Sequence, residues 1–295
     1  MHILRIPRDL SLERGSLSGS TFVTAGMAED RAALRGVTLD FGNTLVPVTR
    51  PALDEVVAIT CRWLAARTGA TPEELARIWD EERERQWRED VPAFRETDMR
   101  IRMARVMARS RGTPPPAEDE RWDDESTVAS ADPTELATAL DVYGHAFSAL
   151  PPSDGAGALL ARLAGRGLTL GILSNWPLAA AIDYYAEVHG WTEHLAAIVV
   201  SERVGTIKPR VEIFRAAEAA LGLLPASLLH VGDDWTADVE GALDAGWHAA
   251  WVRDRPADTP LPGGTPDPTR RPDLVLDRLA DLDRAFDLWL PPRPF

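Results

Sequence analysis

An aspartate stands at the end of the first run of this sequence that has the composition of a buried strand. In VTLDFGNTLV, residues 37–46, Asp40 closes the run, and Gly42, Asn43 and Thr44 follow. A carboxylate at the carboxyl end of a parallel strand lies where open α/β sheets place their active sites, and it can act as a nucleophile. Asp-x-Gly-Asn is also ordinary turn chemistry. The remaining polar residues decide between these two interpretations.

Polar side chains also accompany three later strands. Ser174 and Asn175 end the run LGILSN, Lys208 precedes Pro209 and a helical segment, and HVGDDWTAD contains Asp233, Asp234 and Asp238. Each feature has a structural explanation by itself, because helix caps often use serine or asparagine and turns often contain aspartate. Together with Asp40, they place polar groups at four positions of one predicted sheet.

Composition singles out one of these residues. Lys208 is the sole lysine among 295 residues, and Asn43 and Asn175 are the two asparagines, whereas arginine abounds. This bias is typical of a GC-rich genome, in which an ordinary surface lysine would have become arginine. The presence of lysine at position 208 therefore indicates a specific role for this residue.

Charge and cysteine content exclude several classes of function. The formal net charge of −14 argues against nonspecific binding to nucleic acid or to anionic membranes. No apolar run reaches the 18 residues or so of a membrane span. The single cysteine, Cys61, lies in a helical pattern and rules out an internal disulfide, which favours a reducing, cytoplasmic location.

Alternating helices and strands after Pro151 must position the polar groups. Strands are expected at LTLGILSN, LAAIVVS, SLLHVGDD and WHAAWV, with helices over 154–165, 178–188, 210–221 and 236–245. A Pro/Gly-rich loop then leads to a short strand, DLVLD, and a helix near 279–289. Such alternation predicts an α/β fold with a doubly wound parallel sheet.

A helical segment is predicted to interrupt this core after its first strand. Four helices are expected within residues 51–150, with an acidic, proline-rich connection at 113–132. The core then comprises residues 34–50 and 151–295. Residues 1–33, rich in Ser, Gly and Arg, are expected to form a disordered extension.

The order and spacing of these residues resemble the haloacid dehalogenase-like hydrolase superfamily, whose members are mostly phosphatases. That family has a nucleophilic Asp in a D-x-D-x-T motif after the first strand, Ser or Thr after the second, a Lys, and an acidic G-D motif after the fourth. The matching positions are Asp40 with Thr44, Ser174, Lys208, and Asp233 with Asp234 or Asp238. The resemblance covers about residues 34–290. It implies a Rossmann-like core with an inserted helical cap, Mg²⁺ as cofactor and a small phosphorylated substrate.

The resemblance also implies a role for each matching residue. Asp40 would form an aspartyl phosphate, Lys208 would pair with Asp40 and a phosphoryl oxygen, and Ser174 would hold another oxygen. The expected Mg²⁺ ligands are the Asp40 and Asp233 carboxylates and the Gly42 carbonyl, with support from Asp234 or Asp238. Thr44, Asn175 and Trp176 are expected to contact the substrate, although helix capping by Asn175 and packing of Trp176 against the cap are alternatives.

Gly42 departs from the family pattern, because phosphatases of the family carry an acid/base Asp at that position. A positioned acid/base group is typically worth ~10²–10⁴ in rate. Three functions therefore stay open: a Mg²⁺-dependent phosphatase, a weakened relative that binds a ligand or partner without turnover, and a 2-haloacid dehalogenase-type hydrolase. The acidic G-D-D motif resembles a Mg²⁺ site and favours the first function over the third.

Overall fold

A twisted sheet with a parallel centre organises the computed structural model, which describes residues 13–17, 20–24 and 34–289. The strand order is β1-β2-β8-β7-β6-β3-β4-β5. The six parallel strands are β3 (Gly36–Leu39), β4 (Thr169–Ser174), β5 (Ala197–Val200), β6 (Leu228–Gly232), β7 (His248–Val252) and β8 (Leu274–Leu276). The sheet confirms the predicted α/β, Rossmann-like core. Because β3 pairs with β4 on one side and β6 on the other, the residue after β3 lies at the centre of the sheet edge.

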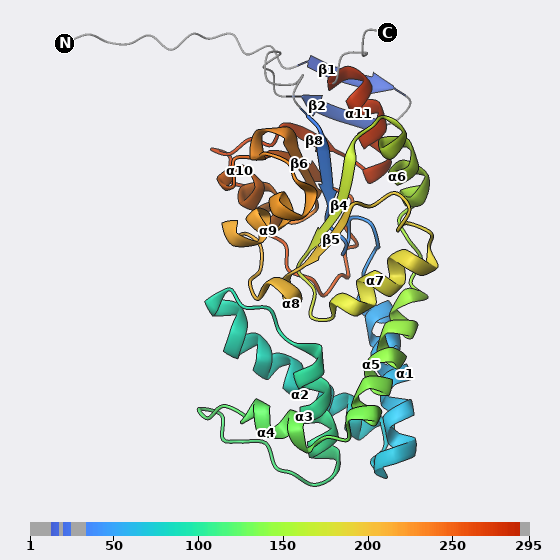
Figure 1. Ribbon diagram of the computed structural model, residues 1–295, viewed down its shortest axis with the longest axis vertical. Helices are drawn as coiled ribbons and strands as arrows, with labels where there is room; N and C mark the ends of the chain where they lie inside the picture. The colour runs from blue at the N-terminus through green and yellow to red at the C-terminus, as the bar shows by residue number, and fades with distance from the viewer. Residues whose placement is uncertain (1–12, 18–19, 25–33, 290–295) are drawn as a thin grey trace, which may run out of the picture.

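Helices cover both faces of this sheet (Figure 1). The helices of the core are α6 (Ala156–Gly165), α7 (Ala179–Val188), α8 (Ser201–Val204), α9 (Val211–Leu221), α10 (Gly241–Asp244) and α11 (Leu282–Trp289), with short 3₁₀ turns at Pro225–Ser227 and Leu279–Asp281. Phe214 of α9 packs with Leu173 and Leu228 in one apolar cluster, whereas Leu160 of α6 packs with Val37 in another. The two clusters on opposite faces explain why the strands read as continuous apolar runs.

The helix predicted over 236–245 divides into two parts. A π-helical turn, η4 (Trp235–Glu240), precedes α10, and Asp234 caps it by accepting hydrogen bonds from the backbone N–H groups of Thr236 and Ala237. The wider turn directs Asp238 back toward the end of β6, so its position depends on local geometry that apolar spacing does not reveal.

Residues 50–148 form a helical insertion between β3 and α6. Its helices are α1 (Arg50–Thr68), α2 (Pro72–Asp90), α3 (Met99–Ser110), α4 (Asp124–Ser130) and α5 (Pro133–Ser148), with the 3₁₀ turn η2 (Val91–Ala93). Thr71 and Glu74 form a reciprocal capping box at the start of α2, as the sequence TPEE indicates. Helix α4 lies in the segment expected to be a connection. Asp123 caps it, and Arg105 binds both carboxylate oxygens of Asp124 at 2.8 and 2.9 Å, so Asp124 is not part of a solvated loop.

Two strands lie in the segment for which the sequence predicts a disordered extension. Strand β1 (Glu13–Leu17) pairs antiparallel with β2 (Ser20–Thr24), and β2 continues the sheet beside β8. The β-branched and aromatic residues of STFVT suit a strand at this edge. The rest of that extension, residues 1–12, 18–19 and 25–33, lies outside the described residues. Among the helices that the structure describes, none combines the length and apolarity needed to cross a membrane.

Candidate active site

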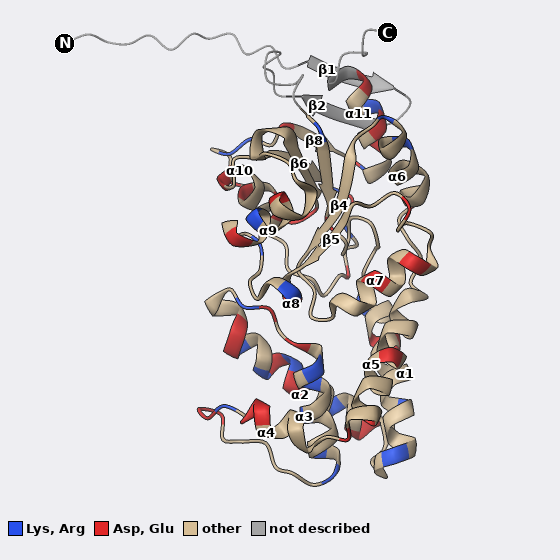
Figure 2. Ribbon diagram, viewed as in Figure 1, with Lys and Arg blue, Asp and Glu red and all other residues tan. Residues whose placement is uncertain are grey.

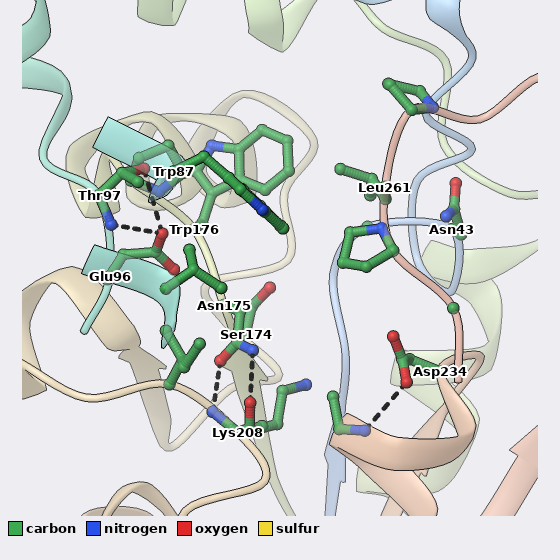
Figure 3. A pocket seen from close by; sticks show the side chains of 18 of the residues that line it. Asn43, Trp87, Glu96, Thr97, Ser174, Asn175, Trp176, Lys208, Asp234 and Leu261 are labelled. Atoms are coloured by element: carbon green, nitrogen blue, oxygen red, sulfur yellow. Dashed lines mark hydrogen bonds between the residues drawn. The ribbon is translucent and has the colours of Figure 1, made fainter. Parts of the chain in front are cut away.

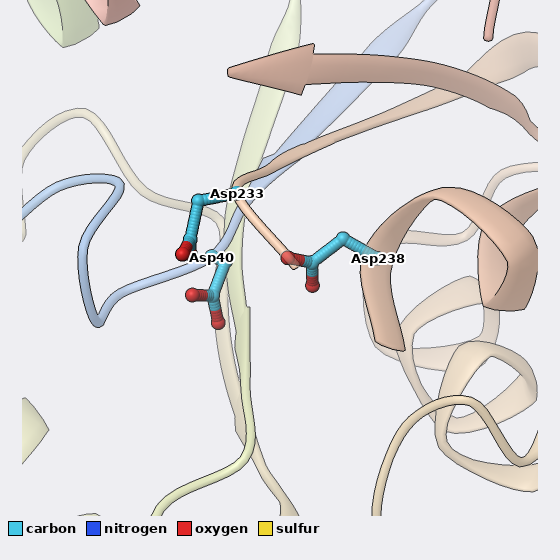
Figure 4. Close-up of side chains that lie close together, drawn as sticks. All are labelled: Asp40, Asp233 and Asp238. Carbon is cyan, nitrogen blue, oxygen red and sulfur yellow. The ribbon is translucent and has the colours of Figure 1, made fainter. Parts of the chain in front are cut away.

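Asp40 lies directly after β3, and two more aspartates converge on it from the segment that follows β6 (Figure 4). Asp233 follows β6, and Asp238 extends from the π-helical turn. All three side chains are buried, and each offers a carboxylate oxygen within 4.8 Å of the others. The structure thus brings together Asp40 and two of the three aspartates of the acidic motif.

Lys208 supplies the positive charge at the centre of this group. Its Nζ lies 2.8 Å from Oδ1 of Asp40 and 2.6 Å from Oδ1 of Asp238, and it donates a third bond to the Leu173 carbonyl at 2.8 Å. The side chain is 2% exposed, and Lys208 also lines the cleft next to Asp40. Burial by itself would lower the pKa of Lys208, but Asp238 and Asp40 raise it, and the lysine is a permanent cation.

His230 belongs to the same network, although the sequence predicts only a packed residue there. Its Nε2 lies 3.0 Å from Oδ1 of Asp238 and 3.3 Å from Nζ of Lys208, and its Nδ1 lies 2.8 Å from the Thr38 hydroxyl. Burial and the Lys208 charge lower the pKa of His230 against the opposing effect of Asp238. The sequence carries no spacing that indicates this role, because the contact depends on the pairing of β3 with β6, which places Thr38 opposite His230.

Burial of three carboxylates leaves the site short of positive charge. Burial, and secondarily Asp238, raises the pKa of Asp40 to about 6 despite the opposing effect of Lys208. Burial, Asp238 and Asp40 raise the pKa of Asp233 to about 8 despite Arg255. Burial opposes ionisation of Asp238 too, but Lys208 and His230 hold its pKa well below its usual range. The three carboxylates share two cations, Lys208 and Arg255, and hard oxygen ligands with such an excess of negative charge fit Mg²⁺.

Two further candidates, Asp234 and Asn175, form hydrogen bonds with the protein backbone. Oδ1 of Asp234 accepts hydrogen bonds from the backbone of Thr236, Ala237 and Gly264. The Asn175 amide accepts from the Lys208 N–H at 2.7 Å and donates to the Lys208 carbonyl at 3.1 Å. Asn175 therefore fixes the backbone that carries the lysine, a positioning task that the sequence did not indicate.

Ser174 and Thr44 border the carboxylates. The Ser174 side chain hydrogen-bonds with Asp40 and favours its ionised form. The Thr44 hydroxyl lies 3.5 Å from Oδ1 of Asp233, and the Asn43 amide lies 3.4 Å from Oδ2. Trp176 is buried against Phe147, with ring centroids 4.9 Å apart, so packing accounts for much of its surface.

The loop between β7 and β8, residues 253–273, covers the opposite side of Asp40 and was not recognised as part of the site. Arg255 of this β7–β8 loop binds Oδ2 of Asp233 at 2.5 Å and donates to the carbonyls of Leu261 and Pro262. A Cβ added at Gly42 would lie 2.7 Å from Cδ1 of Leu261. An aliphatic side chain thus fills the space next to position 42.

A cleft of about 790 Å³ opens above these residues, between the core and the helical insertion. Figure 3 shows Trp87 and Trp176 on one side of the cleft and Leu261 on the other. Figure 2 shows acidic and basic residues interspersed along α2, which lines the cleft with Arg83, Glu84, Trp87 and Arg88, whereas β4 and β5 carry no charge. The wall of the cleft formed by α2 therefore combines charged side chains with the Trp87 indole, which is 48% exposed.

Comparison with known proteins identifies similar sequences over part of the chain. A family model described as haloacid dehalogenase-like hydrolase matches residues 34–246. A phosphoserine phosphatase from Thermus thermophilus is 37% identical over 156 residues, which are 52% of this chain and 55% of the relative. An N-acetylmuramic acid 6-phosphate phosphatase from Pseudomonas aeruginosa is 31% identical over 152 residues, or 50% of this chain and 63% of the relative. The chain thus spans about half to two thirds of the length of these relatives.

Solved structures extend the likeness to most of the fold. A 2-haloacid dehalogenase from Pseudomonas syringae matches with a TM-score of 0.61 and 22% identity, covering 87% of this chain and 99% of that one. A HAD phosphatase from Thermococcus onnurineus matches with a TM-score of 0.55 and 19% identity, covering 86% and 98%. At these identities the likeness concerns the fold, which phosphatases and dehalogenases share.

Proposed function

Because the chain belongs to the haloacid dehalogenase-like hydrolases, we propose that it hydrolyses a small phosphorylated metabolite through an aspartyl phosphate on Asp40. The observation that carries this proposal is the buried Lys208–Asp40 pair at the end of β3, next to Asp233. The named phosphatase activities of the two curated relatives support a phosphorylated substrate. Dehalogenation is the alternative reaction of the fold, but a cluster of three carboxylates short of cations favours a metal-dependent phosphatase.

Asp40 and Lys208 would carry out the chemical step together. Lys208 holds Oδ1 of Asp40 at 2.8 Å, which orients the carboxylate for attack on phosphorus. The same ammonium and the Ser174 hydroxyl would face the phosphoryl oxygens, where negative charge gathers in the transition state. Asp238 and His230 fix the lysine from behind, and Asn175 fixes its backbone.

The donor set fits Mg²⁺, which we propose as the cofactor. Asp40 and Asp233 would hold it, with the carbonyl of Gly42 as a further oxygen donor. Asp238 is less available, because Lys208 occupies its Oδ1 and the Asp234 N–H occupies its Oδ2 at 2.8 Å. When bound, the ion neutralises charge on the phosphoryl group and the attacking carboxylate.

The helical insertion would act as a cap that selects the substrate. It lines the cleft with charged side chains and with Trp87 and Phe94, both of which are exposed. A small metabolite would lie between this wall and Asp40. We propose no nucleic-acid or membrane partner, since the net charge of −14 disfavours both.

A substrate panel tests the proposal directly. Purified protein is assayed against phosphate esters and phosphoanhydrides with Mg²⁺ and with EDTA, and against 2-chloropropionate without metal. Phosphate release that depends on Mg²⁺ and is lost in Asp40→Asn supports the proposal. Chloride release without metal would establish the dehalogenase alternative, and no turnover of any compound, with phosphate binding retained, would establish the weakened relative.

A further inference from the structure

The side of the site that faces the leaving group is apolar. Next to Gly42, a Cβ would meet Leu261 at 2.7 Å, Trp176 at 3.7 Å and Val48 at 3.9 Å. Leu261 is held in place because Arg255 binds its carbonyl and Asp233 together, and because the Thr259 hydroxyl bonds Asn43 at 3.2 Å. Glycine at 42 and leucine at 261 thus form one packed unit in the place where an acid/base side chain would stand.

The acids that line the cleft outside the Asp40, Asp233 and Asp238 cluster do not replace this group. Asp234 uses Oδ1 to cap the π-helical turn and to bind Gly264. Glu96 accepts from Thr97 with one oxygen and from Ser201, at 2.6 Å, with the other. Glu84 lies on the exposed side of α2 in the helical insertion. Among the described residues of the cleft, none of these carboxyls is both free and held beside position 42.

We infer that the substrate carries its phosphoryl group on an acidic leaving group, such as a carboxylic acid, a phosphate or a phenol, and not on an aliphatic alcohol. The inference rests on the proposed phosphatase function. When Asp40 attacks phosphorus, the bond from phosphorus to the leaving oxygen breaks and that oxygen keeps the electron pair. Without a protein acid to donate a proton, only an oxygen that is stable as an anion leaves readily.

The second half of the reaction also needs a leaving oxygen that is stable as an anion, and Asp40 provides it. A water molecule attacks the aspartyl phosphate, the bond from phosphorus to Asp40 breaks, and the carboxylate keeps the electron pair. The proton of the water passes to the released phosphate or to solvent. The leaving group in this step is itself a carboxylate, so its departure needs no acid. Both steps are therefore compatible with a site in which Leu261 fills the space beside Gly42.

The dependence of rate on leaving group tests the inference without any mutation. We expect kcat/KM to fall at least ~10²-fold from acetyl phosphate and 4-nitrophenyl phosphate to ethyl phosphate, which is the low end of what a general acid supplies. Parent protein that hydrolyses ethyl phosphate within about tenfold of 4-nitrophenyl phosphate would overturn the inference while leaving the proposed function intact. Failure to hydrolyse any phosphate would refute the proposed function itself.

A set of variants examines the packed unit. Gly42→Asp with Leu261→Ala adds a carboxylate and the room for it, and we expect ethyl phosphate turnover to rise ~10²-fold relative to 4-nitrophenyl phosphate. Leu261→Ala alone is the matched control and should leave that ratio near the parent value. An unchanged ratio of ethyl phosphate to 4-nitrophenyl phosphate turnover in the double variant, with unchanged circular dichroism and phosphate binding, would contradict the assignment of this space to the missing acid.

Discussion

The two sides of Asp40 differ in chemistry. Toward the interior, Lys208, Asp238 and His230 form a polar network in which each group has a partner at 2.6–3.3 Å. Toward the cleft, Leu261 fills the space beside Gly42. The interior side serves the nucleophile and the charge on phosphorus, and the cleft side serves the leaving group. The difference indicates that these two tasks vary independently within one fold.

Substitutions on the polar side of Asp40 are expected to reduce the stability of the fold more than substitutions on the apolar side. Lys208 compensates two buried carboxylates, and removing the lysine is expected to cost about 3–5 kcal/mol, the typical penalty for leaving a buried charge unpaired, because both carboxylates would lose their cation. Leu261 comes from a loop and contacts position 42 through the end of a flexible side chain. A changed loop residue therefore alters the chemistry with little effect on the core.

The largest expected effect comes from Asp40→Asn. An amide cannot form the aspartyl intermediate, so we expect activity to fall by at least ~10⁴-fold. Burial raises the pKa of Asp40 to about 6, so its charge at neutral pH opposes folding, and the variant should melt at the parent temperature or higher. Steady-state kinetics and thermal unfolding measure the two quantities. Asp244→Asn, which removes a surface carboxylate paired with Arg270, is the control. Retained turnover would show that Asp40 is not the nucleophile.

Lys208→Arg should reduce kcat by about 10²–10³-fold, the usual cost of losing one transition-state donor. The planar guanidinium cannot act as a compact charge beside Asp40, Asp238 and the Leu173 carbonyl at once. Arg210→Lys, at an exposed pair with Glu212, makes the reverse exchange outside the site and should change little. Unchanged vanadate affinity and kcat in Lys208→Arg would remove the lysine from the reaction.

Arg255→Gln probes the cleft side and should tighten Mg²⁺ binding by about tenfold. The guanidinium binds Oδ2 of Asp233, so a metal ion must compete with it for that carboxylate. Isothermal titration calorimetry measures the affinity without reference to activity, and Arg253→Gln, which breaks the exposed pair with Asp277, is the matched control. Weaker binding in Arg255→Gln would mean that Arg255 helps to form the metal site.

The sequence predicts the polar side of Asp40 much better than the apolar side. Asp40, Ser174 and Asp233 lie at the ends of apolar strands, and parallel strands bring such residues to one edge of a sheet, whereas composition singles out Lys208. Leu261 and Arg255 lie in a Pro/Gly-rich loop without periodicity, so no pattern indicates where their side chains go. Hydrogen bonds from Arg255 to Asp233 and from Thr259 to Asn43 help to set the conformation of that loop, and these bonds form only in the folded chain.

Fold prediction shows the same division between regular and irregular elements. Apolar runs predict the parallel strands, and the predicted helices begin one or two residues before α6, α7 and α9 and end at the same residues as these helices. Helix α4 was missed because its sequence DESTVAS is polar, and it depends on the distant Arg105 for its anchor. Tertiary contacts of this kind override weak local propensity.

The smallest expected effect concerns Glu96, where the helical insertion meets the core beside the cleft. Burial raises the pKa of Glu96 against the opposing hydrogen bond from Ser201, so the folded state favours the neutral acid. The resulting stability is complete below the unfolded value near 4.5 and is lost as pH rises through the folded value. Neutral Glu96→Gln should therefore increase the free energy of unfolding by about 0.5–1 kcal/mol at pH 7 and should match the parent below pH 4. Chemical denaturation at both pH values measures the difference, and lower stability of the variant at pH 7 would show that the charged bond to Ser201 outweighs the burial of Glu96.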